Sequence, residues 1–60
     1  MNAKKEKEAN RLAEMLLANY RRWNSGDISH KEYLKNQARI SDMVVAANVW
    51  DEIAARGFYL

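Results

Sequence analysis

Side chains that could do chemistry are few in this sequence. The chain has one histidine, His30, and no cysteine. Nucleophilic catalysis needs a base held against a hydroxyl or thiol, but His30 lies beside Lys31 in what we expect to be the solvated first turn of a helix. Asp51 and Glu52 are adjacent, and adjacent side chains on a helix point about 100° apart, so they do not form a catalytic pair. We therefore expect no catalytic residue, no small-molecule substrate and no enzyme.

The stretch "NSGDISHKEYL" has the order of residues found in the second half of a calcium-binding loop. An EF-hand loop with its turn glycine at Gly26 and its last carboxylate at Glu32 needs oxygen ligands at positions 21, 23 and 25. Those positions hold Arg21, Trp23 and Ser25. Two of the three cannot ligate a cation, and one of them is itself a cation. Since no cysteine and no pair of histidines is present either, we expect no metal site and no cofactor.

Two long helices are the elements that the sequence predicts. The chain has no proline, and its only glycines, Gly26 and Gly57, divide it into two stretches. In the first stretch apolar residues recur at i, i+3, i+4 and i+7, the spacing of one helix face. That face comprises Ala9, Leu12, Ala13, Leu16, Leu17, Tyr20 and Trp23.

Capping signals set the limits of the second helix. Ser29 stands where an N-cap should be, with Glu32 three residues later, and this pair forms a capping box that Ile28 can close as a hydrophobic staple. Arg56 followed by Gly57 is typical of a helix end. We predict an all-α, two-helix antiparallel hairpin that forms a single domain. Its expected ranges are 1–60 for the domain, about 3–24 for the first helix, 25–28 for the turn, about 29–56 for the second helix and 57–60 for an apolar tail.

The second predicted helix is apolar on two sides. One stripe comprises Tyr33, Ile40, Met43, Val44, Ala47, Trp50 and Ala54. The other, called the second stripe below, comprises Leu34, Ala38, Val45, Val49 and Ile53. A helix that is apolar on two sides must be covered on two sides, whereas the first helix covers only one, and 60 residues are near the size at which a single core is marginal. We therefore expect a homodimer that forms a four-helix bundle, or a different protein on the second stripe.

The turn sequence "GDISHKEY", residues 26–33, resembles the G-x-I-[ST]-x-x-E-[FY] core of SHOCT-type short domains. These are small bacterial helical hairpins that are associated with oligomerisation and often lie at the C-terminus of larger proteins. The resemblance implies a self-association or docking module.

Large apolar residues of the second helix and the tail are the candidates for contact with a twin or with another protein. These candidates are Leu34, Met43, Val45, Val49, Trp50, Ile53, Phe58, Tyr59 and Leu60. The tail has two possible arrangements, because it can dock in a groove of a partner or fold back onto Ala9 and Leu12.

Nucleic acid is the alternative partner. Basic residues gather near the turn end of the predicted hairpin, and a positive surface with aromatic residues can bind phosphates and stack on bases. The candidates are Arg21, Arg22, Lys31, Lys35 and Arg39, interleaved with Tyr20, Trp23 and Tyr33. The other interpretation is that the aromatic residues belong to the core and the cations to an ordinary solvated face. A net charge of +2 permits an anionic partner without requiring one.

Hydropathy argues against a membrane role. No apolar run approaches the ~18 residues that span a bilayer, and the basic start is followed by an amphipathic segment where a secretion signal would be apolar throughout. The absence of cysteine fits a reducing compartment, and we expect a cytoplasmic protein. Its size is typical of small regulators, adaptors or inhibitors, such as those of phages or mobile elements, that act by binding another protein. The alternative is a small nucleic-acid-binding regulator.

Overall fold

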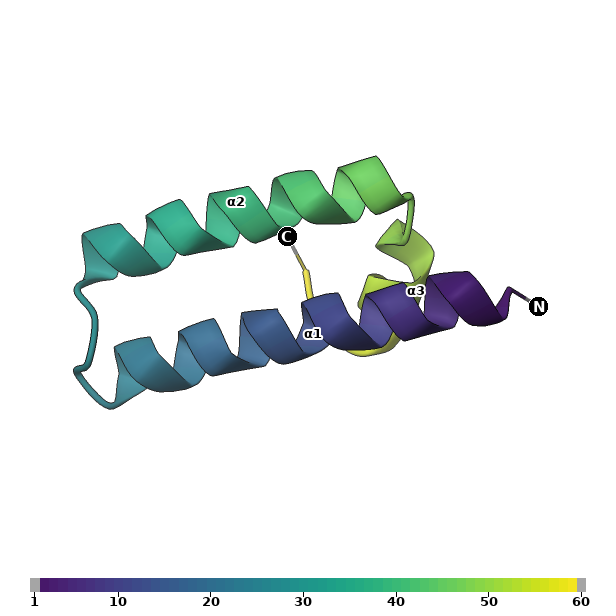
Figure 1. The fold of residues 1–60 in the computed structure, drawn as a ribbon. Coiled ribbons are helices and arrows are strands. Elements are labelled where there is room, and N and C mark those ends of the chain that lie inside the picture. Colours follow the sequence, from purple (N-terminus) through teal and green to yellow (C-terminus); the bar gives the residue numbers. More distant parts are fainter. Residues whose placement is uncertain (1, 60) are drawn as a thin grey trace.

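The computed structural model of this chain describes residues 2–59, and all regular structure among them is helical. Three helices follow one another: α1, Ala3–Asn24; α2, His30–Ala47; and α3, Trp50–Ala55. Helices α1 and α2 lie side by side and antiparallel, and α3 lies at the end away from their turn (Figure 1). The molecule is a rod of 38 × 17 × 15 Å. The predicted all-α class and the packing of two long helices are confirmed, while dimerisation stays a prediction.

Both long helices begin at the side-chain caps that their sequences provide. Asn2 Oδ1 accepts a hydrogen bond of 3.1 Å from the N–H of Lys4 at the start of α1. Ser29 Oγ accepts one of 3.1 Å from the N–H of Glu32, as the capping box predicts for α2. Ile28, directly before this cap, is buried with 7% of its surface exposed, in keeping with its predicted role as a staple.

All three helices end in the same motif, in which one residue adopts a left-handed backbone conformation. Gly26, Asn48 and Gly57 have φ angles of 86°, 55° and 87°. After each of them, a backbone N–H bonds the carbonyl five residues earlier, which is the pattern of a Schellman cap. These bonds are Asp27 to Arg22 (2.8 Å), Val49 to Val44 (3.2 Å) and Phe58 to Ile53 (3.4 Å).

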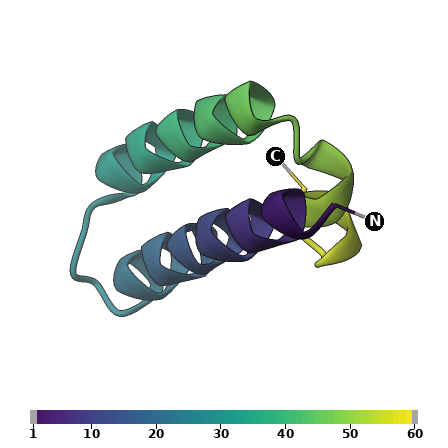
Figure 2. The ribbon, with the colours of Figure 1, turned by 45° about the vertical axis from the view of Figure 1, so that its right-hand side comes forward.

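The second helix is shorter than the sequence predicts. The prediction of one helix over 29–56 is wrong, because α2 ends at Ala47 and a separate helix, α3, begins at Trp50. The break lies at Asn48, since asparagine enters the left-handed region at less cost than other residues that carry a Cβ. Figure 2 shows α3 turned back beside the N-terminal part of α1. The hairpin therefore covers part of its own second stripe.

The core lies where α1, α2 and α3 meet. Its buried apolar residues are Ala9, Leu12, Leu16, Ile40, Val44, Val49 and Ile53. Val49 and Ile53 are fully buried, because the interruption of the helix at Asn48 turns the end of the second stripe toward the core. At the turn end, the rings of Trp23 and Tyr33 stack with their centroids 4.6 Å apart and close the hairpin.

Arg56 fastens α3 to α1 by polar contacts. Its Nη2 lies 2.8 Å from Glu6 Oε2 and donates a hydrogen bond of 2.6 Å to Asn10 Oδ1. Its Nη1 donates a further bond of 2.6 Å to the carbonyl of Glu52 in α3, the helix that Arg56 follows. One side chain thus connects the C-terminal end of the chain to the first turns of α1.

Candidate interaction surfaces

The outer face of α2 exposes the first half of the second stripe. Leu34 and Val45 are 52% and 56% exposed, and Ala38 between them is exposed too. These three residues lie on one face of α2 because they are four and seven positions apart. We call them the outer face of α2. They are the part of the second stripe that stays exposed, whereas Val49 and Ile53 are buried in the core because the chain reverses at Asn48.

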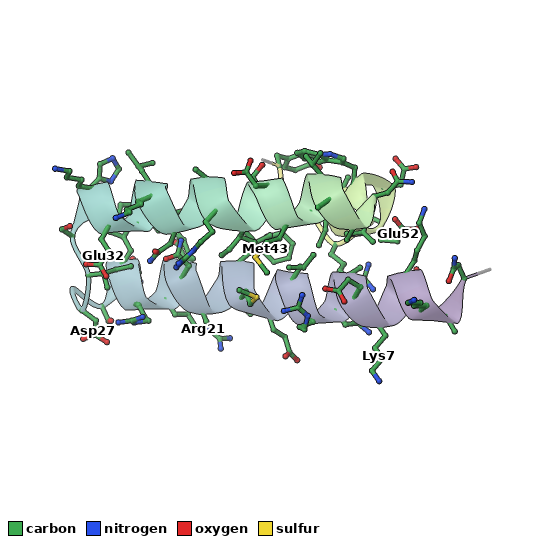
Figure 3. The ribbon with its side chains drawn as sticks, turned by 45° about the horizontal axis from the view of Figure 1, so that its top comes forward. Lys7, Arg21, Asp27, Glu32, Met43 and Glu52 are labelled. Atoms are coloured by element: carbon green, nitrogen blue, oxygen red, sulfur yellow. The ribbon has the colours of Figure 1, made fainter. Side chains whose placement is uncertain are left out.

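The rest of the predicted protein-binding residues divide into buried and exposed ones. Val49 and Ile53 have no exposed surface, so the prediction that they contact a partner is not compatible with this arrangement of α3. Met43 and Phe58 are partly buried against the core, and Figure 3 shows Met43 between the two long helices. Trp50 is 39% exposed.

The tail folds back at its first residue and is exposed at its second. Phe58 lines a hollow together with Ala13, Leu17 and Arg56, so the ring lies against α1. Tyr59 is 86% exposed and lacks comparable cover. Leu60, also predicted to bind a partner, lies outside the described residues.

Two adjoining hollows near the turn bring most of the predicted basic residues together. One is lined by Ser29, Lys31, Glu32, Lys35, Asn36 and Arg39. The other, on the groove between α1 and α2, is lined by Met15, Ala18, Asn19, Arg22, Asn36, Arg39 and Ile40. The two share Asn36 and Arg39, so Arg22, Lys31, Lys35 and Arg39 form one basic face. Arg21 lines neither hollow, and its side chain points away from α2 (Figure 3).

A buried asparagine orients this basic face. Asn19 is only 5% exposed, and its Nδ2 donates a hydrogen bond of 3.1 Å to the carbonyl of Tyr33. Its Oδ1 accepts one of 3.0 Å from Asn36 Nδ2, while Asn36 Oδ1 accepts a longer bond of 3.4 Å from Arg39 Nη2. A buried amide is stable only when it is paired, so this network fixes how α1 and α2 are aligned and holds Arg39 at the groove.

Sequence reasoning did not identify Asn19, although a signal was present. Asn19 lies between Leu16 and Trp23 on the apolar face of the first helix, where a polar residue needs a partner across the interface. Asn36 is that partner. Their pairing could not be read from one helix alone, because it depends on the alignment of both.

The aromatic residues at the turn pack mainly on one another. Trp23 stacks on Tyr33, lies 5.6 Å from the ring of His30 and meets the edge of Tyr20 at 6.0 Å, all measured between centroids. Trp23 and Tyr33 are partly buried, which favours the interpretation that they belong to the core. Tyr20 is 47% exposed and is therefore more accessible than Trp23 and Tyr33.

Residues 2–59 contain neither a candidate metal site nor a helix that could span a membrane. No three side chains from histidine, cysteine, aspartate and glutamate come close enough there to hold a metal ion. Over the same residues, no helix combines the length and the apolar composition needed to cross a bilayer. A scan against protein-family models gave no match, and searches of curated proteins and of solved structures gave no significant match.

Proposed function

We propose that this chain is a small non-enzymatic interaction protein that self-associates through the outer face of α2 and binds another protein as a regulator, adaptor or inhibitor in the cytoplasm. The observation that supports it is the exposure of Leu34 and Val45, at 52% and 56%, on one face of a helix whose opposite face forms the core. Exposed apolar faces of this kind mark protein contacts. The resemblance of the turn sequence to SHOCT-type domains supports the same role.

The exposed area sets the strength of such a contact. The outer face of α2 runs from Leu34 to Val45, about 17 Å along the helix. If two copies pair through this face, burial of the exposed halves of Leu34 and Val45 in each copy contributes about 4 kcal/mol to the free energy of association. Association itself costs at least about 4 kcal/mol in lost freedom of motion. We call the observed arrangement, with α3 packed on α1 of the same chain, the closed hairpin. Pairing of two closed hairpins through the outer face of α2 alone is therefore weak and depends on protein concentration.

A charge placed in the outer face tests this proposal. Val45→Glu puts a carboxylate into the contact, so it should abolish the rise in mass with concentration that we expect of the unmodified chain in sedimentation equilibrium. Ala46→Glu is the matched control, because Ala46 is an exposed residue on the same helix that points about 100° away from Val45. Equal masses for all three chains at every concentration would contradict self-association through this face.

The exposed aromatic residues are the proposed contact with another protein. Trp50 and Tyr59 lie outside the outer face of α2, at 39% and 86% exposure, and aromatic rings are common anchors of protein interfaces. Removing Tyr59 and Leu60 should weaken the binding of a specific partner protein to this chain without changing the oligomeric state of the chain. Capture should be insensitive to salt, because the contact is apolar.

Nucleic-acid binding is the second candidate, and the convergence of Arg22, Lys35 and Arg39 favours it. Phosphate binding by this basic face should fall steeply as salt rises. Arg39→Glu should weaken it severalfold, whereas Arg21→Glu, with the same change in charge, should weaken it less because Arg21 lies outside the two hollows. Equal losses of affinity in the Arg39→Glu and Arg21→Glu variants would mean that only the net charge of the chain attracts the nucleic acid.

A further inference from the structure

The break between α2 and α3 leaves helix hydrogen bonds unmade. Asn48 adopts the left-handed conformation, and no side chain caps the start of α3. The first backbone bond of α3 is from the N–H of Ile53 to the carbonyl of Val49. In an unbroken helix, the N–H groups of residues 50–52 would bond the carbonyls of residues 46–48. Joining α2 to α3 therefore restores these bonds and removes one left-handed residue.

The sequence pattern is continuous across this break. Val45, Val49 and Ile53 are spaced four residues apart, so an unbroken helix places them on one face with Leu34. Such a helix over 30–55 is about 39 Å long, close to the 38 Å length of the whole rod. The pattern that predicted one long helix is thus satisfied by a second arrangement of the same chain, with the hinge at residues 48 and 49.

A second copy carries the same α1 and α3 surfaces, so the contacts of α3 with α1 can in principle form between two chains. Val49 and Ile53 share a core cluster with Ala9 and Leu12 of α1. Arg56 reaches back to Glu6, also on α1. A straightened hinge carries α3 away from its own α1, and α1 then needs the same cover from a second chain. A helix of six residues has no stability of its own, so α3 must be packed in one place or the other.

We infer that two copies of this chain exchange their α3 helices. In this dimer α2 and α3 form one continuous helix, and α3 packs on α1 of the partner copy. The inference rests on the proposed self-association and deepens it, because exchange adds the whole α1–α3 contact to the weak contact between the outer faces of α2. The area between the copies then rises toward that of a stable dimer.

The closed hairpin is the form of the isolated chain for two reasons. Asp51 and Glu52 lie in the first turn of α3, where carboxylates are stabilised by the helix dipole. The α1–α3 contact within one chain also forms at a high effective concentration. The exchanged dimer therefore becomes the main species only as the protein concentration rises.

Charge reversal across the α1–α3 contact tests exchange directly. Glu6→Arg places two cations at this contact, and Arg56→Glu places two anions there, so each variant disfavours its own contact. In a mixture of the two, an exchanged dimer of one chain of each kind has opposite charges at both contacts. We expect native mass spectrometry to show such mixed dimers in about tenfold excess over the statistical amount. Glu6→Arg mixed with Arg21→Glu is the control for net charge.

Substitution of the hinge gives a second, independent measurement. Alanine disfavours the left-handed conformation and favours helix. Asn48→Ala should therefore raise the association constant of the dimer about tenfold for each of its two hinges, and should raise its helicity. Asn48→Gly should weaken the dimer, because glycine accepts the left-handed conformation and is a poor helix former. If instead Asn48→Ala merely lowers the stability of a monomer, the exchange is refuted.

The outcomes separate exchange from simple self-association. Mixed dimers in excess only for the Glu6→Arg and Arg56→Glu pair support exchange. Statistical mixing, with dimers that respond to Val45→Glu, overturns exchange and leaves the contact through the outer face of α2 standing. Monomers in every mixture at every concentration overturn both.

Discussion

Ile53→Ala is the substitution that best separates the closed arrangement of α3 from a single long helix. Ile53 has no exposed surface and shares the core cluster with Leu12 and Val44. Truncation of a fully buried isoleucine to alanine typically lowers the free energy of unfolding by 2–5 kcal/mol, and we take about 3 kcal/mol here. A 60-residue domain has only about 3–9 kcal/mol in total. The variant should therefore lose a third or more of its stability, and α3 should be released from α1 more readily.

The matched comparison is Val45→Ala, on α2. Val45 belongs to the same stripe but is 56% exposed, so its truncation should cost no more than about 0.5 kcal/mol. Urea denaturation followed by circular dichroism measures both values, at a concentration low enough to keep the chains monomeric. Hydrogen exchange of the amides of α3 then shows whether α3 opens first. Similar small losses for the two variants would refute the burial of Ile53 and with it the reversal of the chain at Asn48.

Three further substitutions test local parts of the fold. Gly26→Ala should cost about 1–2 kcal/mol in urea denaturation although, apart from the two chain neighbours, no atom of residues 2–59 lies within 4 Å of the added Cβ, because the φ of 86° is the source of the strain; no loss at all would contradict this conformation. Ser29→Ala should cost about 1 kcal/mol by removing the cap on the N–H of Glu32, and a change confined to α1 amides in hydrogen exchange would argue against that role. Asn19→Ala should cost about 1–3 kcal/mol by leaving the carbonyl of Tyr33 and the amide of its partner asparagine unpaired, so an unchanged urea midpoint would refute the network.

Local signals account for the parts of the fold that the sequence predicts. The first helix and the turn carry strong local signals, namely the apolar face of residues 9–23, the glycine at position 26 and the cap at Ser29. Each of these depends on neighbours within a few positions, and α1 ends at Asn24 as its pattern indicates. The helix end predicted at Gly57 is likewise present, in the form of a Schellman cap.

The break at Asn48 could not be predicted from local signals. Asparagine is tolerated inside helices, and the apolar spacing of Val45, Val49 and Ile53 continues through it. The reversal is stabilised by burial of Val49 and Ile53 against α1, which is a contact between distant parts of the chain. The sequence therefore identified the second stripe as apolar, but it could not show that the reversal at Asn48 buries Val49 and Ile53 within the same chain.

The candidate surfaces were predicted in outline only. Charge counts placed five cations near the turn, but adjacent residues on a helix diverge, so Arg22 reaches the basic face and Arg21 does not. Asn36 and Asn19 connect the two helices at that face through a pairing that depends on their alignment. The exposure of Leu34 and Val45 agrees with the predicted second stripe.

Self-association is tested most simply by the mass of the unmodified chain in solution, followed by sedimentation equilibrium over a wide dilution series. We expect the mass to rise from that of one chain to that of two as concentration increases, and Val45→Glu should abolish that rise. A single-chain mass at every concentration would contradict self-association, and the outer face of α2 would then have no second copy to cover it.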